Sequence, residues 1–344
     1  CPLIKCNIQN IFYGHDSFSK ASSEFNRDSV NPDNGIKFFD CVGNKLSNDK
    51  ERAIEKIFRD EAMLKSAQAQ DKLIGKSKRI DDVIGRYIVH IKNSFPKPLS
   101  LAGKKVVVDC ANGAAYKVAP TILQELGADV VVIGNNPDGF NINEGCGAMH
   151  PEVLSKAVKE AKADLGVALD GDADRVVIVD EKGNIIHGDK LIGSLAIYLK
   201  EAGALKGNGV VTTVMSNSAL EDYLGEHRLR LHRSAVGDKN VVDMMMVEGV
   251  NFGGEQSGHI IFSDYAKTGD GLASALLALA YLSTSNKSAS DLFNPFELYP
   301  QKLVNLNISN KKEIESLSGI EELKAKIKSL NIRHLFRYSG TENK

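Results

Sequence analysis

The stretch VALDGDADRVVIVD, residues 167–180, places an acidic turn between two apolar runs. Both runs are rich in valine and other residues that favour β-strands buried in a sheet. The turn carries three aspartates at alternate positions, Asp170, Asp172 and Asp174. Arg175 follows them directly. We therefore expect two strands joined by a short loop whose carboxylates converge at the end of a sheet.

A regular alternation of strand and helix signals extends outward from this stretch. Further strand runs lie at 104–110, 129–134, 209–216, 228–235 and 258–262. Helical patterns lie near 116–126, 151–163, 189–202, 218–225, 238–247 and 271–283. Strands separated by helices predict βαβ units and parallel sheets. We expect an α/β fold with two similar blocks, at about 97–200 and 201–295, and a tail with one strand and a helix near 311–329.

The composition excludes several classes of protein. The chain has 344 residues, of which 42% are hydrophobic and 25% charged, and its net charge is −1. This balance gives no overall attraction to nucleic acid or to an anionic membrane. No apolar run approaches the roughly 20 residues of a membrane span. The five cysteines are scattered and include no CxxC pair, which favours reduced thiols and a cytoplasmic protein: Cys1, Cys6, Cys41, Cys110 and Cys146.

The acidic turn has three readings. A solvated turn is the simplest one, but the flanking apolar runs place these carboxylates at the carboxyl end of a buried strand, where open α/β sheets bind ligands. An EF-hand loop would fit Glu181 at its last position, yet Arg175 stands where that loop needs glycine. A Mg²⁺ or Ca²⁺ site fits the oxygen-only ligands. Because guanidinium binds phosphate well, Arg175 beside a metal points to phosphoryl transfer.

Other polar motifs supply matching parts. NFGGEQSGHIIF (251–262) sets Glu255, Ser257 and His259 at alternate positions after two glycines, and such groups suit sugar hydroxyls. The same segment is also readable as a turn entering a strand with incidental polar residues. AVGDKNV (235–241) offers Lys239, although Asp238 there equally predicts a helix N-cap.

A turn near the end of the chain has the composition of an anion-binding nest. FRYSGTEN (336–343) contains Arg337, Ser339, Gly340 and Thr341. Successive backbone N–H groups combined with hydroxyls and a guanidinium can hold a phosphate.

Taken together, these motifs resemble the α-D-phosphohexomutase family in order and spacing. DNGIKFFDCVGNKLS (33–47) and NINEGCGAMHP (141–151) add to the match, which covers residues 31–343. Gln256 makes the chain most similar to the bacterial phosphoglucosamine mutase branch. The resemblance implies repeated α/β units with mixed sheets around a central cleft, plus a partial α+β domain at the C-terminus. The implied domains are 1–96, 97–200, 201–295 and 296–344.

The resemblance also implies a reaction and a set of roles. Glucosamine 6-phosphate and glucosamine 1-phosphate would interconvert through a phosphoserine and a sugar 1,6-bisphosphate, with Mg²⁺, toward UDP-N-acetylglucosamine and cell-wall synthesis. By resemblance, Ser29 is the phosphorylated nucleophile and completes the metal site of the three aspartates. Lys37 and His259 match positions of proton transfer, and Arg175 steadies the transferred group. The substrate-binding residues would be Lys239, Glu255, Ser257, Arg337, Ser339, Gly340 and Thr341.

The chain departs from the family pattern around the serine. In RDSVNPDNGIKFF (27–39), Val30 replaces a histidine, and two residues before Asp33 are missing. The opening segment has no match in residues 1–30, and the fourth domain stops after its phosphate loop. We expect a truncated or locally altered mutase with its second and third domains intact. The alternatives are a remnant that only binds metal and phosphosugar, or a phosphomannomutase/phosphoglucomutase. Expected partners are a phosphosugar and a second copy in a homodimer, with no nucleic acid and no membrane.

Overall fold

The computed structural model describes residues 46–69, 82–306, 312–330 and 333–338. The chain divides into two compact units, residues 1–297 and 298–344. Among the described residues, none of the helices combines the length and apolar character that crossing a bilayer requires.

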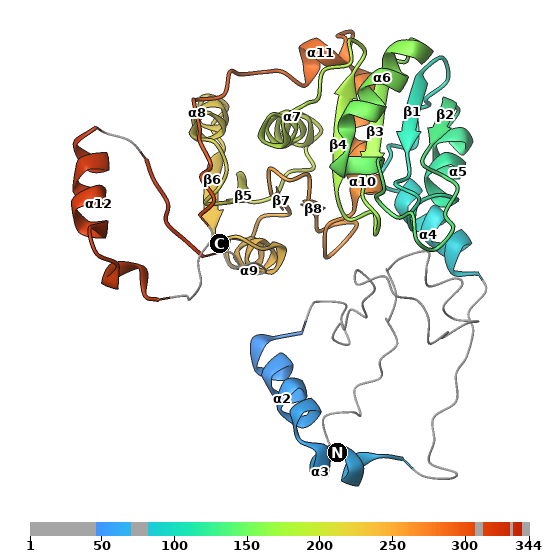
Figure 1. The fold of residues 1–344 in the computed structure, drawn as a ribbon. Helices are drawn as coiled ribbons and strands as arrows, with labels where there is room; N and C mark the ends of the chain where they lie inside the picture. Colours follow the sequence, from blue (N-terminus) through green and yellow to red (C-terminus); the bar gives the residue numbers. More distant parts are fainter. Residues whose placement is uncertain (1–45, 70–81, 307–311, 331–332, 339–344) are drawn as a thin grey trace. The chain divides into compact units, whose positions relative to one another are not determined.

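The first sheet of the larger unit is mixed and has the strand order β2-β1-β3-β4 (Figure 1). Its strands are β1 (Lys105–Asp109), β2 (Asp129–Ile133), β3 (Leu165–Leu169) and β4 (Val176–Asp180). β1 pairs in parallel with β2 and with β3, whereas β4 runs antiparallel to β3. The quoted stretch is therefore the β3–β4 hairpin, as the sequence predicts.

The second sheet repeats this arrangement with the order β6-β5-β7-β8. Its strands are β5 (Gly209–Thr213), β6 (Arg230–Ser234), β7 (Phe252–Gly254) and β8 (Ile260–Phe262). β5 lies parallel to β6 and β7, and β8 is antiparallel to β7. The sequence pattern did not predict β7, because a strand of three residues that contains two glycines carries almost no β-signal.

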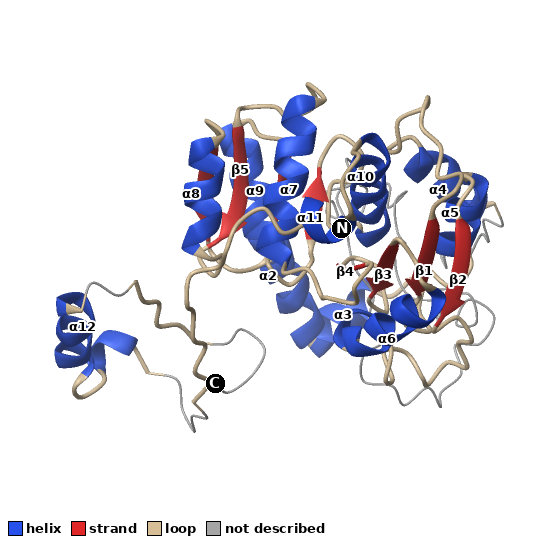
Figure 2. Cartoon of the chain, turned by 90° about the horizontal axis from the view of Figure 1, so that it is seen from above, coloured by secondary structure: helices blue, strands red, loops and turns tan. Residues whose placement is uncertain are grey.

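Helices cover both faces of each sheet (Figure 2). In the first sheet, α6 (Pro151–Ala161) packs on β1, β3 and β4, and α5 (Val118–Glu125) packs on β2. In the second, α9 (Asp238–Glu248) and α8 (Ser218–Glu226) take the same places. Both blocks are therefore α/β sandwiches of one design, as predicted.

Two long helices tie the blocks together. α7 (Gly188–Glu201) follows the first sheet in sequence but contacts β7 and α8. α10 (Gly271–Thr284) follows the second sheet and contacts β3 and β4 as well as β8. α10 is almost entirely buried, in keeping with its Leu/Ala-rich sequence. One apolar cluster consequently includes strand residues of both sheets, such as Val108, Ile178, Val210 and Ile260.

The remaining described elements lie at the two ends of the chain. α2 (Asn48–Arg59), α3 (Glu61–Ala67) and α4 (Val83–Lys92) precede the first sheet, and α11 (Ala289–Leu292) follows α10. The second unit contains a short 3₁₀ turn, Ile314–Ser316, and α12 (Ile320–Ser329). The predicted helix near 311–329 is thus shorter than expected, and the described part of the tail shows no strand.

Candidate functional site

The three aspartates converge, as the sequence predicts. One carboxylate oxygen from each of Asp170, Asp172 and Asp174 lies within 4.8 Å of the others. The loop turns sharply at Ala173, whose φ of 59° is left-handed, and the Ala173 N–H donates to the Asp170 carbonyl at 3.0 Å. The Arg175 N–H donates to Asp170 Oδ1 at 3.0 Å. The backbone of the loop therefore holds the carboxylates together despite their mutual repulsion.

The electrostatics of this loop favour a cation. Burial, and after it the neighbouring Asp174 and Asp172, raise the pKa of Asp170 to about 7. The guanidinium of Arg175 offsets this only partly, since its Nε lies 3.9 Å from both Asp170 and Asp174 and 45% of its side chain is exposed. A hard divalent ion such as Mg²⁺ prefers carboxylate oxygens of this kind. The donor set and its charge fit that ion.

Glycines bring a neighbouring turn into close contact with this loop. The Ala114 N–H donates to the Gly171 carbonyl oxygen at 2.8 Å. A Cβ at Gly113 would meet that same oxygen at 2.2 Å. A Cβ at Gly171 would in turn meet the Ile142 side chain at 2.7 Å. The loop is thus fixed from the turn after β1 and from the NINEGCGAMHP segment (141–151).

The second polar loop is the β7–β8 hairpin. The Glu255 N–H donates to the His259 carbonyl at 2.9 Å, and the Gly258 N–H donates to the Glu255 carbonyl at 3.0 Å. Glu255 Oε1 accepts from the Gly237 N–H at 3.1 Å. Ser257 is exposed and Glu255 half-buried. The segment is thus a tight turn entering a strand, as one of the two interpretations predicts, and the turn also leaves a second strand, β7.

The two loops are in direct contact. The Val176 N–H, at the end of the acidic loop, donates to the Gly258 carbonyl at 3.0 Å. His259 is buried, and its Nδ1 lies 3.6 Å from Asp174 Oδ1. Its Nε2 lies 3.7 Å from Asp238 Oδ2. The loop of the three aspartates and the loop that carries Glu255 and Ser257 are thus adjacent.

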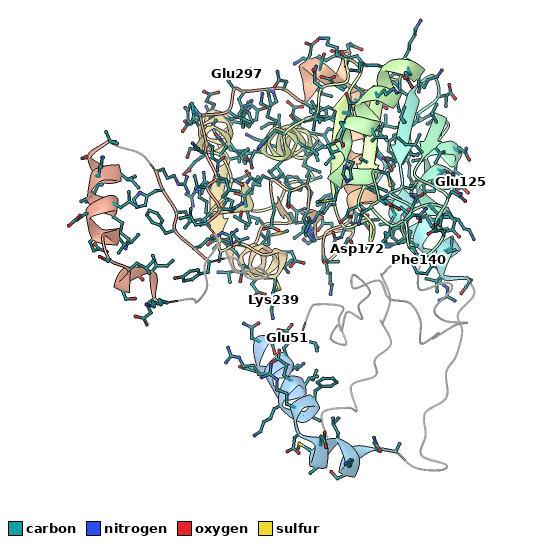
Figure 3. The ribbon with its side chains drawn as sticks, in the orientation of Figure 1. Glu51, Glu125, Phe140, Asp172, Lys239 and Glu297 are labelled. Atoms are coloured by element: carbon teal, nitrogen blue, oxygen red, sulfur yellow. The ribbon has the colours of Figure 1, made fainter. Side chains whose placement is uncertain are left out.

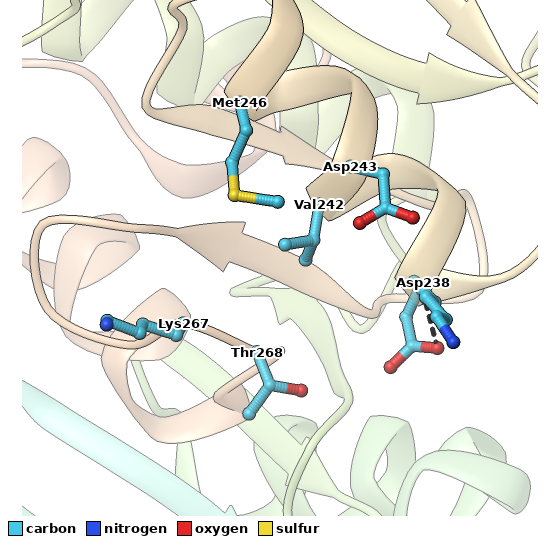
Figure 4. A pocket seen from close by; sticks show the side chains of 7 residues that line it. Asp238, Val242, Asp243, Met246, Lys267 and Thr268 are labelled. Atoms are coloured by element: carbon cyan, nitrogen blue, oxygen red, sulfur yellow. Dashed lines mark hydrogen bonds between the residues drawn. The ribbon is translucent and has the colours of Figure 1, made fainter. Parts of the chain in front are cut away.

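Lys239 lies in the first turn of α9. The N-cap of this helix is Gly237, so Asp238 is its first residue and the predicted N-cap is wrong by one position. Lys239 Nζ donates to the Leu46 carbonyl at 2.7 Å and lies 3.6 Å from Glu51, toward which it points in Figure 3. A shallow pocket lined by Asp238, Asp243, Met246, Lys267 and Thr268 separates α9 from the loop before α10 (Figure 4).

Several predicted site residues lie outside the described residues. Ser29 and Lys37 precede residue 46, and Ser339, Gly340 and Thr341 follow residue 338. Arg337 is described in the second unit, where it is exposed and its Nη1 donates to the Tyr338 carbonyl at 3.4 Å. The roles given to these residues remain predictions.

The structure excludes the EF-hand alternative. Val176–Asp180 is a strand paired with β3, so the chain does not wrap an ion there. Glu181, at the last position of the hypothetical calcium loop, accepts instead from the Ser290 N–H at 3.0 Å and from its hydroxyl at 2.6 Å. It holds α11 against the sheet.

Two backbone N–H donors of this region were not predicted from the sequence. The Gly237 N–H holds Glu255, and the Gly269 N–H donates to His259 Nε2 at 3.1 Å. Backbone groups leave no residue-type signature. The nearest signal is a glycine beside a helix start, present as VGD at 236–238 and as TGDG at 268–271.

Family models match both sheets. The model described as phosphoglucomutase/phosphomannomutase, alpha/beta/alpha domain II, matches residues 85–183, and the corresponding domain III model matches residues 187–299. The phosphoglucosamine mutase of Sulfurovum sp. is 67% identical over 318 residues, which are 92% of this chain and 72% of that protein. The phosphoglucosamine mutase of Aliarcobacter butzleri is 61% identical over the same shares.

Solved structures agree on the fold. An Aspergillus fumigatus N-acetylphosphoglucosamine mutase in complex with GlcNAc-6P and magnesium aligns with TM-score 0.56 at 24% identity. A structure of the same enzyme with glucose 1,6-bisphosphate also has TM-score 0.56, at 23% identity. Each alignment covers 76% of this chain, and 64% and 59% of those chains respectively. The chain therefore spans less than two thirds of these solved enzymes.

Proposed function

This chain belongs to the phosphoglucomutase/phosphomannomutase family, and from that premise we propose that it interconverts glucosamine 6-phosphate and glucosamine 1-phosphate. The family membership expected from the sequence is confirmed by models over two domains and by curated phosphoglucosamine mutases up to 67% identical. The α/β fold with mixed sheets and the enzyme class, a phosphohexomutase isomerase of amino sugar metabolism, are confirmed likewise.

One observation carries the proposal. The loop that gathers Asp170, Asp172 and Asp174 is hydrogen-bonded through Val176 to Gly258 of the loop that presents Glu255 and Ser257. Phosphoryl transfer between sugar hydroxyls needs a centre of positive charge beside a grip on the sugar. The contact between the loops supports metal binding and sugar binding at adjacent positions.

Each described residue then has a task. Asp170, Asp172 and Asp174 would hold Mg²⁺, which when bound neutralises charge on a phosphoryl group. Arg175, whose guanidinium is half-exposed, would hold oxygens of that same group. Glu255 is already oriented by the Gly237 N–H, so its second carboxylate oxygen would accept a hydrogen bond from a sugar hydroxyl. Ser257 would bind an adjacent hydroxyl.

The remaining parts of the proposal come from sequence. We keep Ser29 as the phosphorylated nucleophile, Lys37 and His259 for proton transfer, and Lys239, Arg337, Ser339, Gly340 and Thr341 for substrate binding. A sugar 1,6-bisphosphate would be the intermediate and activator, as suggested by the Aspergillus fumigatus complex with glucose 1,6-bisphosphate. The predicted domain bounds, the cytoplasmic compartment and the homodimer belong to the same proposal.

Phosphoserine labelling combined with turnover tests the proposal. The protein is incubated with glucosamine 1,6-bisphosphate, and peptide mass spectrometry locates any phosphate. We expect label on Ser29 and conversion of glucosamine 6-phosphate to glucosamine 1-phosphate. Binding without label or turnover would instead establish the metal- and phosphosugar-binding remnant.

Two comparisons make the result specific. Asp172→Asn should lower turnover by roughly 10²–10³-fold, whereas Asp222→Asn, at an exposed aspartate on α8, should leave it unchanged. The ratio kcat/KM for glucosamine 6-phosphate should exceed that for mannose 6-phosphate and glucose 6-phosphate. The reverse order would identify a phosphomannomutase/phosphoglucomutase.

A further inference from the structure

We propose that the turn Thr268–Gly271 positions the acidic loop at 170–175. Gly269 and Gly271 act as its positioning residues, and Tyr87 on α4 anchors the turn. The inference concerns how this chain holds its metal-binding carboxylates, and it rests on the proposed function of that site. No other role in the site has been given to these residues.

Gly269 sets the orientation of His259. Its N–H donates to His259 Nε2 at 3.1 Å, so Nε2 serves as the acceptor and the ring proton lies on Nδ1. Nδ1 is the nitrogen that faces Asp174, at 3.6 Å from Oδ1. Since His259 is buried, the ring has little room to choose another orientation. A buried hydrogen bond from a backbone N–H to one ring nitrogen fixes both the tautomer and the orientation of the imidazole.

No side chain fits at Gly269. A Cβ there would lie 2.2 Å from His259 Nε2 and 2.4 Å from its Cδ2. Its φ is not in the left-handed region, so the backbone conformation itself does not require glycine. Close approach to the imidazole is therefore the reason for glycine at this position.

Gly271 holds the backbone of the acidic loop. Its N–H donates at 2.9 Å to the carbonyl of Ala173, the residue in the left-handed conformation between Asp172 and Asp174. A Cβ at Gly271 would meet the Arg175 carbonyl at 2.4 Å. The turn thus reaches Asp174 in two ways. Gly269 holds His259, which faces the Asp174 side chain, and Gly271 holds the carbonyl of the preceding residue, Ala173.

The turn itself is anchored to α4. Asp270 caps α10 by accepting from the Ala273 N–H at 2.8 Å. The Tyr87 hydroxyl donates to both Asp270 oxygens, at 3.2 Å and 3.0 Å. His90, one turn further along α4, is hydrogen-bonded through Nε2 to the Tyr265 carbonyl at 2.7 Å. α4 therefore stabilises the turn Thr268–Gly271, which in turn contacts the loop of the proposed metal ligands.

Metal binding by graded variants tests this chain of contacts. The probe is Mn²⁺, titrated into the full-length protein and followed by electron paramagnetic resonance of the free ion. Loss of an outer-shell contact typically weakens metal affinity by about 10–100-fold. We expect Gly269→Ala and Gly271→Ala to fall in that range. Gly225→Ala on α8 is the matched control, since nothing lies within 4 Å of its added Cβ, and it should bind as wild type.

Tyr87→Phe keeps the test decisive if a glycine variant fails to fold. It removes only the hydroxyl that donates to Asp270, and we expect a weakening of a few-fold. A spectroscopic signature separates positioning from general destabilisation. In ¹⁵N NMR of the metal-free wild type, His259, assigned by comparison with His259→Gln, should show an unprotonated Nε2, and Gly269→Ala should change that signal.

The results separate this inference from the proposed function. Mn²⁺ affinity and the His259 signal are measured without turnover, so absence of mutase activity in the wild type would refute only the function. Wild-type Mn²⁺ affinity in Gly269→Ala and Gly271→Ala, with an unchanged His259 signal, would overturn the inference. So would equal weakening in Gly225→Ala.

Discussion

The β3–β4 and β7–β8 hairpins occupy the same position in two sheets of the same strand order, yet they carry different chemistry. In the first, Asp170 lies against two other carboxylates, and its pKa is raised to about 7. In the second, Glu255 lies against the Gly237 N–H, a neutral donor that suits its charge. The same fold position thus gathers three carboxylates in one repeat and presents a single hydrogen-bonded carboxylate in the other.

This difference teaches that the loop residues, and not the topology, decide what each hairpin binds. Three carboxylates held close together repel one another, and a bound cation would relieve that repulsion. A carboxylate that already has a donor is oriented for directional contacts with hydroxyls.

The largest effect is expected in the acidic loop. Asp172→Asn removes one of the three negative charges while keeping the shape of the side chain. We expect kcat to fall by roughly 10²–10³-fold, the range for losing one electrostatic contact to a transition state. Steady-state kinetics at saturating Mg²⁺ measure it. A fall of less than threefold would mean that the acidic loop has no special role.

A smaller and different effect is expected in the β7–β8 hairpin. Glu255→Gln keeps an oxygen for the Gly237 N–H but removes the negative charge proposed to accept hydrogen bonds from sugar hydroxyls. We expect kcat/KM to fall by about 10–100-fold, as for the loss of a charged hydrogen bond. Mn²⁺ affinity should stay as in wild type. Weakened Mn²⁺ binding in this variant would erase the distinction between the two hairpins.

Stability should respond equally in the two repeats. Ile178 on β4 and Ile260 on β8 are both fully buried in the cluster shared by the sheets. Ile178→Val and Ile260→Val should each lower the free energy of unfolding by about 1 kcal/mol. Urea denaturation followed by circular dichroism should show one transition for the larger unit. Two separate transitions would show that the repeats do not share a core.

The smallest effect is specific to the first repeat. Burial raises the pKa of the Cys110 thiol from 9.0 to about 12. The unfolded chain therefore releases this proton at lower pH than the folded one, so stability falls as the pH rises above about 9. Between pH 8 and pH 9.5 the loss should be below about 1 kcal/mol. Cys110→Ala should reduce this slope, measured by urea denaturation, and an unchanged slope would contradict the assignment.

Much of this architecture is readable in the sequence, for identifiable reasons. The runs that became β1, β3 and β5 are apolar or β-branched and bounded by turn residues, so the local signal and the packing agree. The aspartate cluster was predictable because a loop at a strand end can bring alternate carboxylates together. Glu255 and Ser257 stood out because they alternate after two glycines, although the strand β7 that precedes them was not predicted.

The rest depends on contacts that no local pattern encodes. β7 forms because Phe252 and two glycines fit between β5 and β8, which is a tertiary effect. Gly237 and Gly269 act through backbone N–H groups, which every residue except proline possesses. The contacts of α7 with the second sheet and of α10 with the first are likewise invisible in periodicity.

The crossing of α7 and α10 limits how this protein can be recombined. In a chimera joined just after residue 187, β3 and β4 of one parent would pack against α10 of the other. The apolar surfaces of sheet and helix would then come from different proteins and would fit less well. Exchange of one repeat between relatives should therefore give a stable protein only when α10 comes from the same parent as β3 and β4, and α7 from the same parent as β7 and α8. The unit that can be exchanged is thus defined by spatial contacts and not by a continuous stretch of the gene.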